Sequence, residues 1–185
     1  MRALPCLSIL VAAAALAACG GSLQAIAGKA PELPESQKPP RAVPVRLHAA
    51  ARLNVDAQGR PLALVARVYK LRQNAAFEQA PFSAFLNPAA EKEAFGADVV
   101  EVKDVTLVPG QRYETVEKVT REAGYIGVVA LFHSPAPQRW RLAFAAPEAE
   151  KAGLTVGVHA CALSAGAGAK PTVDEVKTLG SARCQ

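Results

Sequence analysis

The sequence predicts a mainly β domain, an antiparallel β-sandwich with a short helical insert after the second strand. Seven segments have the composition of strands, and turn-forming residues separate them, a pattern typical of a sandwich. The first of these segments alternates apolar and polar side chains with a period of two. Residues 74–95, which follow the second segment, contain Ala, Glu, Gln and Lys between aromatic residues.

The first strand is expected at residues 45–53, where Arg46, His48 and Arg52 take the positions between apolar side chains. A polar loop over residues 54–61 is rich in turn formers. It leads into the second strand, expected at residues 62–71.

The insert of residues 74–95 is expected to form one or two short helices. Pro81 fits the first turn of a helix better than its interior. Four phenylalanines lie in or at the end of this stretch, and we expect them to be core anchors and not a ligand site. They are Phe77, Phe82, Phe85 and Phe95.

The other five strands are expected at residues 98–108, 112–120, 125–132, 140–144 and 154–163. The segment 125–132 has no polar face, so we place it centrally and covered on both sides. In the next strand Trp140, Leu142 and Phe144 are expected to point one way, and Arg139 and Arg141 the other. The tail of residues 164–185 is expected to be mobile, apart from a short helix near residues 173–179.

The first 18 residues have the layout of a secretory signal peptide, with Arg2 before an apolar stretch. The ending Leu16-Ala17-Ala18-Cys19 resembles the lipobox of bacterial lipoproteins, which implies cleavage before Cys19 and lipidation of that cysteine. The alternatives are an ordinary signal peptide with an incidental cysteine and an uncleaved membrane helix, although the apolar run is shorter than the roughly 20 residues of a spanning helix. Gly20 follows the cysteine where an Asp would signal inner-membrane retention, so we expect the periplasmic face of the outer membrane.

Residues 19–44 are expected to form the lipidated N-terminus and a flexible linker, because five prolines lie there among polar residues. They are Pro31, Pro34, Pro39, Pro40 and Pro44. The sandwich domain is then expected to span residues 45–163.

The sequence favours binding over catalysis. Its formal charge of +5 is spread along the chain, so a nucleic-acid partner has little support. It has no nucleophile-elbow motif, no phosphate loop and no CxxC pair. His159 and Cys161 would lie on one face of a strand and could begin a metal site, but no third ligand is evident, so we expect no metal and no cofactor besides the lipid on Cys19.

Removal of the signal peptide and lipidation of Cys19 leave Cys161 and Cys184 in an oxidising compartment. Two alternatives stay open for them. They form a disulfide, or Cys161 is a small buried side chain in its strand and Cys184 lies on a loose tail.

Several short motifs between residues 45 and 163 resemble, in their order and spacing, the outer-membrane lipoproteins of type VI secretion systems, the TssJ/VasD family. Besides the lipobox, they are Leu53-Asn54, Gly59-Arg60-Pro61, Arg67-Val68-Tyr69-Lys70-Leu71, Phe77 with Ala80-Pro81-Phe82, Leu107-Val108-Pro109-Gly110, residues 125–132, Trp140-Arg141 and Ala160-Cys161-Ala162-Leu163.

This resemblance implies a transthyretin-like sandwich and a structural role without turnover. Proteins of the family anchor a secretion complex at the outer membrane by binding the periplasmic C-terminal domain of the inner-membrane component, TssM, which is similar to IcmF. The loop between the first two strands contributes to that contact in the family. Here it corresponds to Asn54, Asp56, Gln58, Gly59 and Arg60, and the alternative for these residues is a solvated turn.

Two other functions stay open. The first is another envelope lipoprotein of sandwich fold, such as a secretin pilotin or a carrier of hydrophobic ligands, which would need an apolar cavity. The second is an enzyme, which would need convergent polar groups with perturbed pKa values in a cleft.

Overall fold

The computed structural model describes residues 33–173 and Cys184. The chain divides into two units, residues 1–33 and 34–185, and the fold described here belongs to the second. The expected signal peptide, Cys19 and most of the linker lie outside the described residues, as does all but the first residue of the helix expected near residues 173–179. None of the helices in the described part is long and apolar enough to span a membrane.

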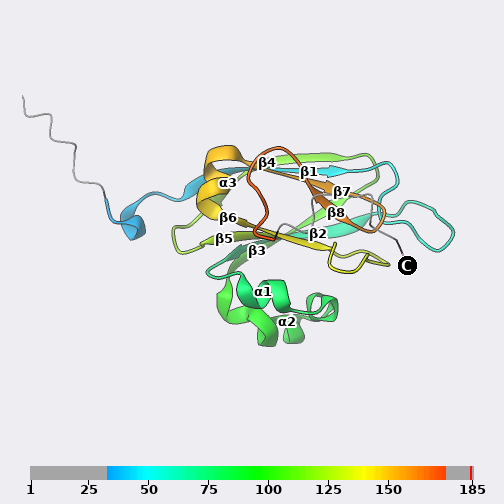
Figure 1. Cartoon of the computed structure of the whole chain (residues 1–185), viewed down its shortest axis with the longest axis horizontal. Coiled ribbons are helices and arrows are strands. Elements are labelled where there is room, and N and C mark those ends of the chain that lie inside the picture. The colour runs from blue at the N-terminus through cyan, green and yellow to red at the C-terminus, as the bar shows by residue number, and fades with distance from the viewer. Residues whose placement is uncertain (1–32, 174–183, 185) are drawn as a thin grey trace, which may run out of the picture. The chain divides into compact units, whose positions relative to one another are not determined.

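Eight strands form two four-stranded sheets that pack face to face (Figure 1). The first sheet has the order β4 (Arg112–Val119), β1 (Arg41–Ala49), β7 (Leu154–Val158) and β8 (Leu163–Ala165). The second has the order β3 (Val99–Leu107), β2 (Leu64–Leu71), β5 (Tyr125–Ala130) and β6 (Arg141–Ala145). The predicted sandwich is confirmed, with one departure from a purely antiparallel arrangement, because β1 and β7 pair in parallel.

The core lies between the sheets and is built from the inward positions of each strand. In β1 the buried positions alternate strictly with more exposed ones, as period two requires. β5 is an interior strand with five of its six residues buried, which confirms the central position expected from its lack of a polar face. The core side chains with no exposed surface include Val43, Val45, Leu47, Leu71, Leu107, Val128, Phe144, Leu154 and Val156.

The insert follows β2 and covers the outer face of the second sheet (Figure 1). It contains α1 (Ala75–Gln79), η2 (Phe82–Leu86), α2 (Pro88–Phe95) and η3 (Gly96–Asp98). Pro81 immediately precedes η2, so it starts a helical turn as expected.

Aromatic packing attaches the insert to the sheet. The rings of Phe77, Phe85 and Phe95 surround that of Tyr69 on β2, with centroids 5.5 to 6.1 Å from it. Phe82 packs against Trp140, with centroids 5.0 Å apart. All four phenylalanines therefore anchor the insert, as expected, and three of them are fully or almost fully buried.

Two arginines on the sheet fix the backbone of the insert. Arg67 donates to the carbonyl of Phe85 at 3.1 Å and to the carboxylate of Glu91 at 2.7 Å. Arg141 donates to the carbonyls of Glu78 and Ala80. These charged donors satisfy carbonyls of short helices that have few backbone bonds of their own.

The structure corrects the first strand, expected at residues 45–53, to residues 41–49. β1 begins at Arg41, and residues 35–37 form a short 3-10 helix, η1 (Glu35–Gln37). The strand contains Pro44 just before its pairing with β7 begins at Val45, where a proline costs no bond on that side. The proline obscured a period-two pattern that extends back to Val43.

The structure also corrects the last strand. The stretch expected as one strand over residues 154–163 is a hairpin of β7 and β8. Beyond it the chain remains packed: Gly166 donates to Thr155, and Thr172 donates to Ala143 at the open edge of β6. A further helix, α3 (Ala146–Ala152), was not expected, because seven residues are too few to show a helical period.

Candidate partner-binding site

The loop of residues 50–63, between β1 and β2, lies at the opposite end of the sandwich from the point where the chain enters it (Figure 1). β1 has nine residues, so it separates the two points by about 30 Å at about 3.3 Å per residue. Three other loops lie at the same end: residues 108–111, 131–140 and 159–162. We call these four loops together the loop end.

The tip of the 50–63 loop is a turn built around the carboxylate of Asp56. This carboxylate accepts hydrogen bonds from the backbone N–H of Gln58 and of Arg60, both at 2.9 Å, and from Nε of Arg60 at 2.7 Å. The N–H of Gly59 donates to the carbonyl of Asp56 at 2.9 Å. Gly59 has φ 75°, a conformation that glycine adopts at little cost. The turn is therefore preformed.

The electrostatics of the turn favour the charged form of Asp56. The backbone N–H of Arg60, followed by the Arg60 guanidinium and the Gln58 N–H, holds the pKa of Asp56 below its ordinary value of 3.8, against partial desolvation. The side chain of Asp56 is 9% exposed, and that of Arg60 is 73% exposed. Asp56 thus shapes the turn, whereas Arg60 is presented to solvent.

Asn54 fixes the base of the loop. It is 5% exposed and has φ 46°. Its Nδ2 donates to the carbonyl of Ala63 at 3.0 Å, and its Oδ1 accepts from the N–H of His133 at 2.7 Å. Both polar atoms are satisfied within the protein, so Asn54 positions the loop and does not offer a contact surface.

The turn of the β7–β8 hairpin holds the 50–63 loop through backbone hydrogen bonds. Its turn carbonyls at His159 and Ala160 accept from the N–H groups of Asn54 and Val55, each at 3.1 Å. Cys161 in this turn is joined to Cys184 by a disulfide. Cys161 belongs to a small cluster of buried side chains together with Ala136 and Ala162.

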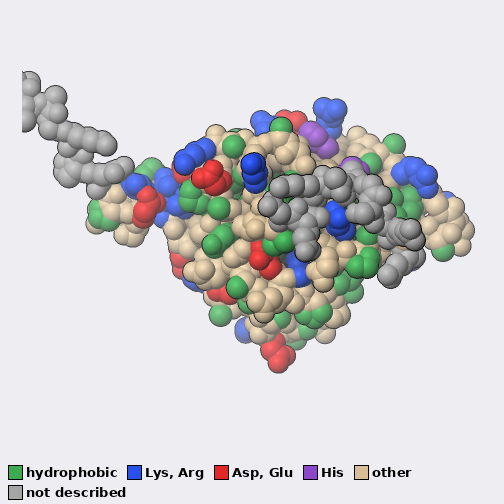
Figure 2. Space-filling model, viewed as in Figure 1, with side chains coloured by type: hydrophobic (Ala, Val, Ile, Leu, Met, Phe, Trp, Pro, Cys, Tyr) green, Lys and Arg blue, Asp and Glu red, His purple; other side chains and the backbone are tan. Residues whose placement is uncertain are grey.

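The exposed residues at the tip are therefore Ala57, Gln58, Gly59 and Arg60, together with Arg52. Arg52 is a site residue that the sequence did not reveal. Its place in the alternation suggested an outward position on the first strand, but that strand ends at Ala49. In the view of Figure 2, basic and not acidic side chains appear at this end of the molecule.

The structure gives no support for a metal site among the described residues. β7 ends at Val158, so His159 and Cys161 lie in a turn and not on one face of a strand, and the sulfur of Cys161 is in the disulfide. Nε2 of His159 lies 2.8 Å from Oγ of Ser164, and burial lowers the pKa of this imidazole. His159 is a packed, hydrogen-bonded side chain.

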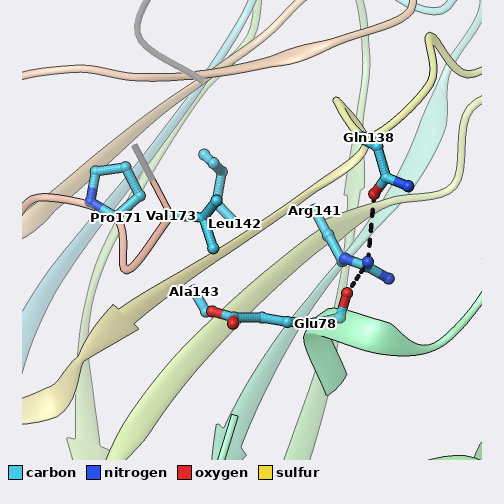
Figure 3. Close-up of a pocket in the computed structure, with 7 residues that line it drawn as sticks. All are labelled: Glu78, Gln138, Arg141, Leu142, Ala143, Pro171 and Val173. Atoms are coloured by element: carbon cyan, nitrogen blue, oxygen red, sulfur yellow. Dashed lines mark hydrogen bonds between the residues drawn. The ribbon is translucent and has the colours of Figure 1, made fainter. Parts of the chain in front are cut away.

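A pocket lies between the insert and the open edge of β6, and Figure 3 shows seven of its lining residues. Its volume is about 90 Å³, below the roughly 300 Å³ at which ligand pockets begin. The guanidinium of Arg141 points to Oε1 of Gln138, at 3.4 Å, and to the carbonyl of Glu78. This pocket does not suit a hydrophobic ligand.

Comparison with protein families shows which class of envelope lipoprotein the chain belongs to. Residues 41–161 match the family described as type VI secretion lipoprotein, VasD, EvfM, TssJ. The chain belongs to this family. It is thus a type VI secretion lipoprotein of the cell envelope. A search of curated protein sequences gave no match.

Solved structures agree with this family. The chain is similar to the type VI lipoprotein TssJ1 from Pseudomonas aeruginosa, with 28% identity and a TM-score of 0.60, over 73% of this chain and all of that one. It is similar to a chain of a "Type VI membrane complex", with 26% identity and a TM-score of 0.62, over 68% of this chain and 97% of that one. It is also similar to a chain in a structure described as "T6SS protein TssM C-terminal domain" from EAEC, with 25% identity, a TM-score of 0.58 and the same coverages.

Proposed function

We propose that this type VI secretion lipoprotein anchors the periplasmic C-terminal domain of a TssM/IcmF-like inner-membrane protein to the outer membrane. The observation that carries the proposal is that the candidate site and the point where the chain enters the domain lie at opposite ends of β1 (Figure 1). A chain held by its N-terminus presents such a loop away from the membrane. The similarity to chains in structures described as a type VI membrane complex and a TssM C-terminal domain supports the choice of partner.

The segment that enters the fold is attached to the sandwich, so the chain joins the domain at a fixed point. Arg121 donates to the carbonyl of Pro39 at 2.7 Å and forms an ion pair with Glu150 at 3.2 Å. Arg41 donates to the carbonyl of Ala123 at 3.3 Å. These bonds hold residues 39–41 against the end of the domain that faces away from the candidate site.

The lipid on Cys19 provides the membrane attachment in this proposal, and no further cofactor is involved. The sequence around Cys19 supports it, with its lipobox-like ending and with Gly20 in the position that sorts lipoproteins between membranes. Several acyl chains hold a protein on a bilayer far more firmly than one. A chain so attached to the outer membrane can bind a partner that crosses the periplasm from the inner membrane.

The role assigned is structural and not catalytic. Two polar side chains at the loop end build the loop: Asp56 bonds within its own turn, and Asn54 bonds to two backbone groups. Such preformed loops lose little conformational freedom on binding, which favours affinity.

The proposal is tested by measuring binding of residues 34–185, which form one compact unit, to the periplasmic C-terminal domain of the cognate TssM-like protein. A Gln58→Ala, Arg60→Ala variant removes exposed side chains at the tip and leaves Asp56 in place. A Lys151→Ala variant on α3, at the opposite end, is the matched control.

We expect saturable binding by the unaltered domain and by the Lys151→Ala control, and weakened binding by the tip variant. Binding that is equal in all three would retain the partner and move the interface away from the tip. If the unaltered domain does not bind, the proposed function is wrong.

A further inference from the structure

Arg52 and Arg60 place two guanidinium groups at the same tip of the 50–63 loop. One terminal nitrogen of Arg52 lies 3.9 Å from the position that a Cβ on Gly59 would occupy, so the Arg52 side chain lies beside the turn that carries Arg60. Both residues are exposed. Arg60 pairs with Asp56, whereas Arg52 has no hydrogen bond or ion pair within the described part of the chain.

The four loops of the loop end contain no acidic residue that is available to Arg52. Among its four loops, residues 50–63, 108–111, 131–140 and 159–162, Asp56 is the only carboxylate, and its oxygens accept three bonds within its own turn. The same loops contain Arg52 and Arg60, two cations beside the single carboxylate of Asp56. The tip of the 50–63 loop therefore has an excess of positive charge.

The opposite end of the sandwich differs, because its arginines are paired. Arg121 pairs with Glu150 at 3.2 Å and Arg72 with Glu122 at 2.5 Å. The arginines near the tether thus have acidic partners, whereas Arg52 beside the candidate site has none among the described residues. Like charges close together cost free energy unless another group offsets them.

We propose that the loop end recognises an acidic surface on the protein partner, with Arg52 as a specificity-determining residue beside Arg60. This inference rests on the proposed function and names the chemistry of the surface that the partner presents. A guanidinium offers several donors in a planar fork that matches a carboxylate. Charged groups of this kind steer association and set register.

The inference is tested by association kinetics of residues 34–185 with the TssM-like C-terminal domain, at about 0.01 M and about 0.15 M salt, where the Debye lengths are about 30 and 8 Å. The variants are Arg52→Ala, Arg52→Lys and Arg52→Glu. Lys151→Glu, on α3, changes the net charge by the same amount as Arg52→Glu and serves as the control.

We expect the association rate at low salt to fall about tenfold in Arg52→Ala and further in Arg52→Glu. Arg52→Lys keeps the charge and should stay within about threefold of the unaltered domain, and Lys151→Glu should do the same. The unaltered domain should also bind more slowly at the higher salt concentration.

Equal association rates for the unaltered domain, Arg52→Ala and Arg52→Glu would overturn the inference and leave the proposed function standing. Absence of binding by the unaltered domain would overturn both. Binding to vesicles that contain phosphatidylglycerol, lost in Arg52→Ala while the association rate with the partner domain stays unchanged, would assign Arg52 to a lipid surface and overturn the inference as well.

Discussion

Asn54 and His133, from loops that follow different strands, are joined by a hydrogen bond of 2.7 Å from the backbone N–H of His133 to Oδ1 of Asn54. The side-chain amide of Asn54 also donates, through Nδ2, to the carbonyl of Ala63. The candidate site therefore owes its shape to a buried side chain that links the 50–63 loop with the 131–140 loop, and not only to its own turn.

Replacing Asn54 by alanine should lower the free energy of unfolding by about 1–3 kcal/mol, because two backbone groups lose their partner. The change is measured by urea denaturation. Asn54→Gly also lacks the amide but tolerates the φ of 46°, so the difference between the two variants isolates the backbone strain, which should be about 1 kcal/mol. An unchanged midpoint in Asn54→Ala would contradict this role.

Removing the disulfide should loosen the support of the loop. A Cys161→Ser, Cys184→Ser variant opens a link with a sequence separation of 23 and should lower stability by about 3 kcal/mol on the chain-entropy model. The amides of Asn54 and Val55, which bond to the β7–β8 turn, should then exchange hydrogen faster than those of β5. The unaltered chain with its disulfide intact is the control, and the unaltered chain in reductant should behave like the variant. Equal exchange in all three samples would count against the idea.

The packing of the insert on the second sheet should leave no room for a side chain at Gly127. A Cβ on Gly127 would lie 2.6 Å from Cζ of Phe77, and the Phe77 ring is enclosed by other aromatic rings. Gly127→Ala should therefore destabilise the fold by about 1–3 kcal/mol through overpacking.

A double-mutant cycle checks this packing contact. Phe77→Leu makes room for the added methyl group, so the combined variant should lose less stability than the sum of the two single changes. Strict additivity would show that the two residues do not share the space.

The turn at the loop tip should keep its structure in mild acid. Because the pKa of Asp56 is lowered in the folded state, its bonds stabilise the protein at and above its ordinary pKa, and this contribution is lost as the pH falls through the lower folded value. The amide signals of Gln58 and Arg60, followed by NMR, should therefore titrate with a midpoint below 3.8, and Asp56→Asn should abolish that titration. A midpoint at or above 3.8 would refute the preformed turn.

The strands could be predicted from the sequence because their side chains alternate or are apolar on both faces, as in β1 and β5. The phenylalanines of the insert could be predicted as anchors because large aromatic side chains are rarely left in water. The start of β1 was misplaced because proline is unusual in a strand. Pro44 is tolerated because the pairing of β1 with β7 begins only at Val45, and this pairing is not evident from the sequence. α3 and the β7–β8 turn were missed because each is too short to show a period.

The site could be predicted in part. The loop, its turn formers and its charged residues are evident from residues 54–61. Which of these residues hold the loop and which are exposed is not evident from the sequence. Asp56 and Asn54 are polar residues that face inward and hold the loop, which only the bonds in the structure reveal. Arg52 escaped notice because its place in the alternation suggested a strand position.

The central claim is that the loop end faces the partner while the opposite end faces the tether. It is tested most directly by placing a photo-crosslinking amino acid at Gln58 in one variant of the full-length lipoprotein and at Lys151 in another, in cells that make the TssM-like protein. The account predicts a crosslink to the partner from position 58 and none from position 151. A crosslink from position 151 with none from position 58 would contradict it.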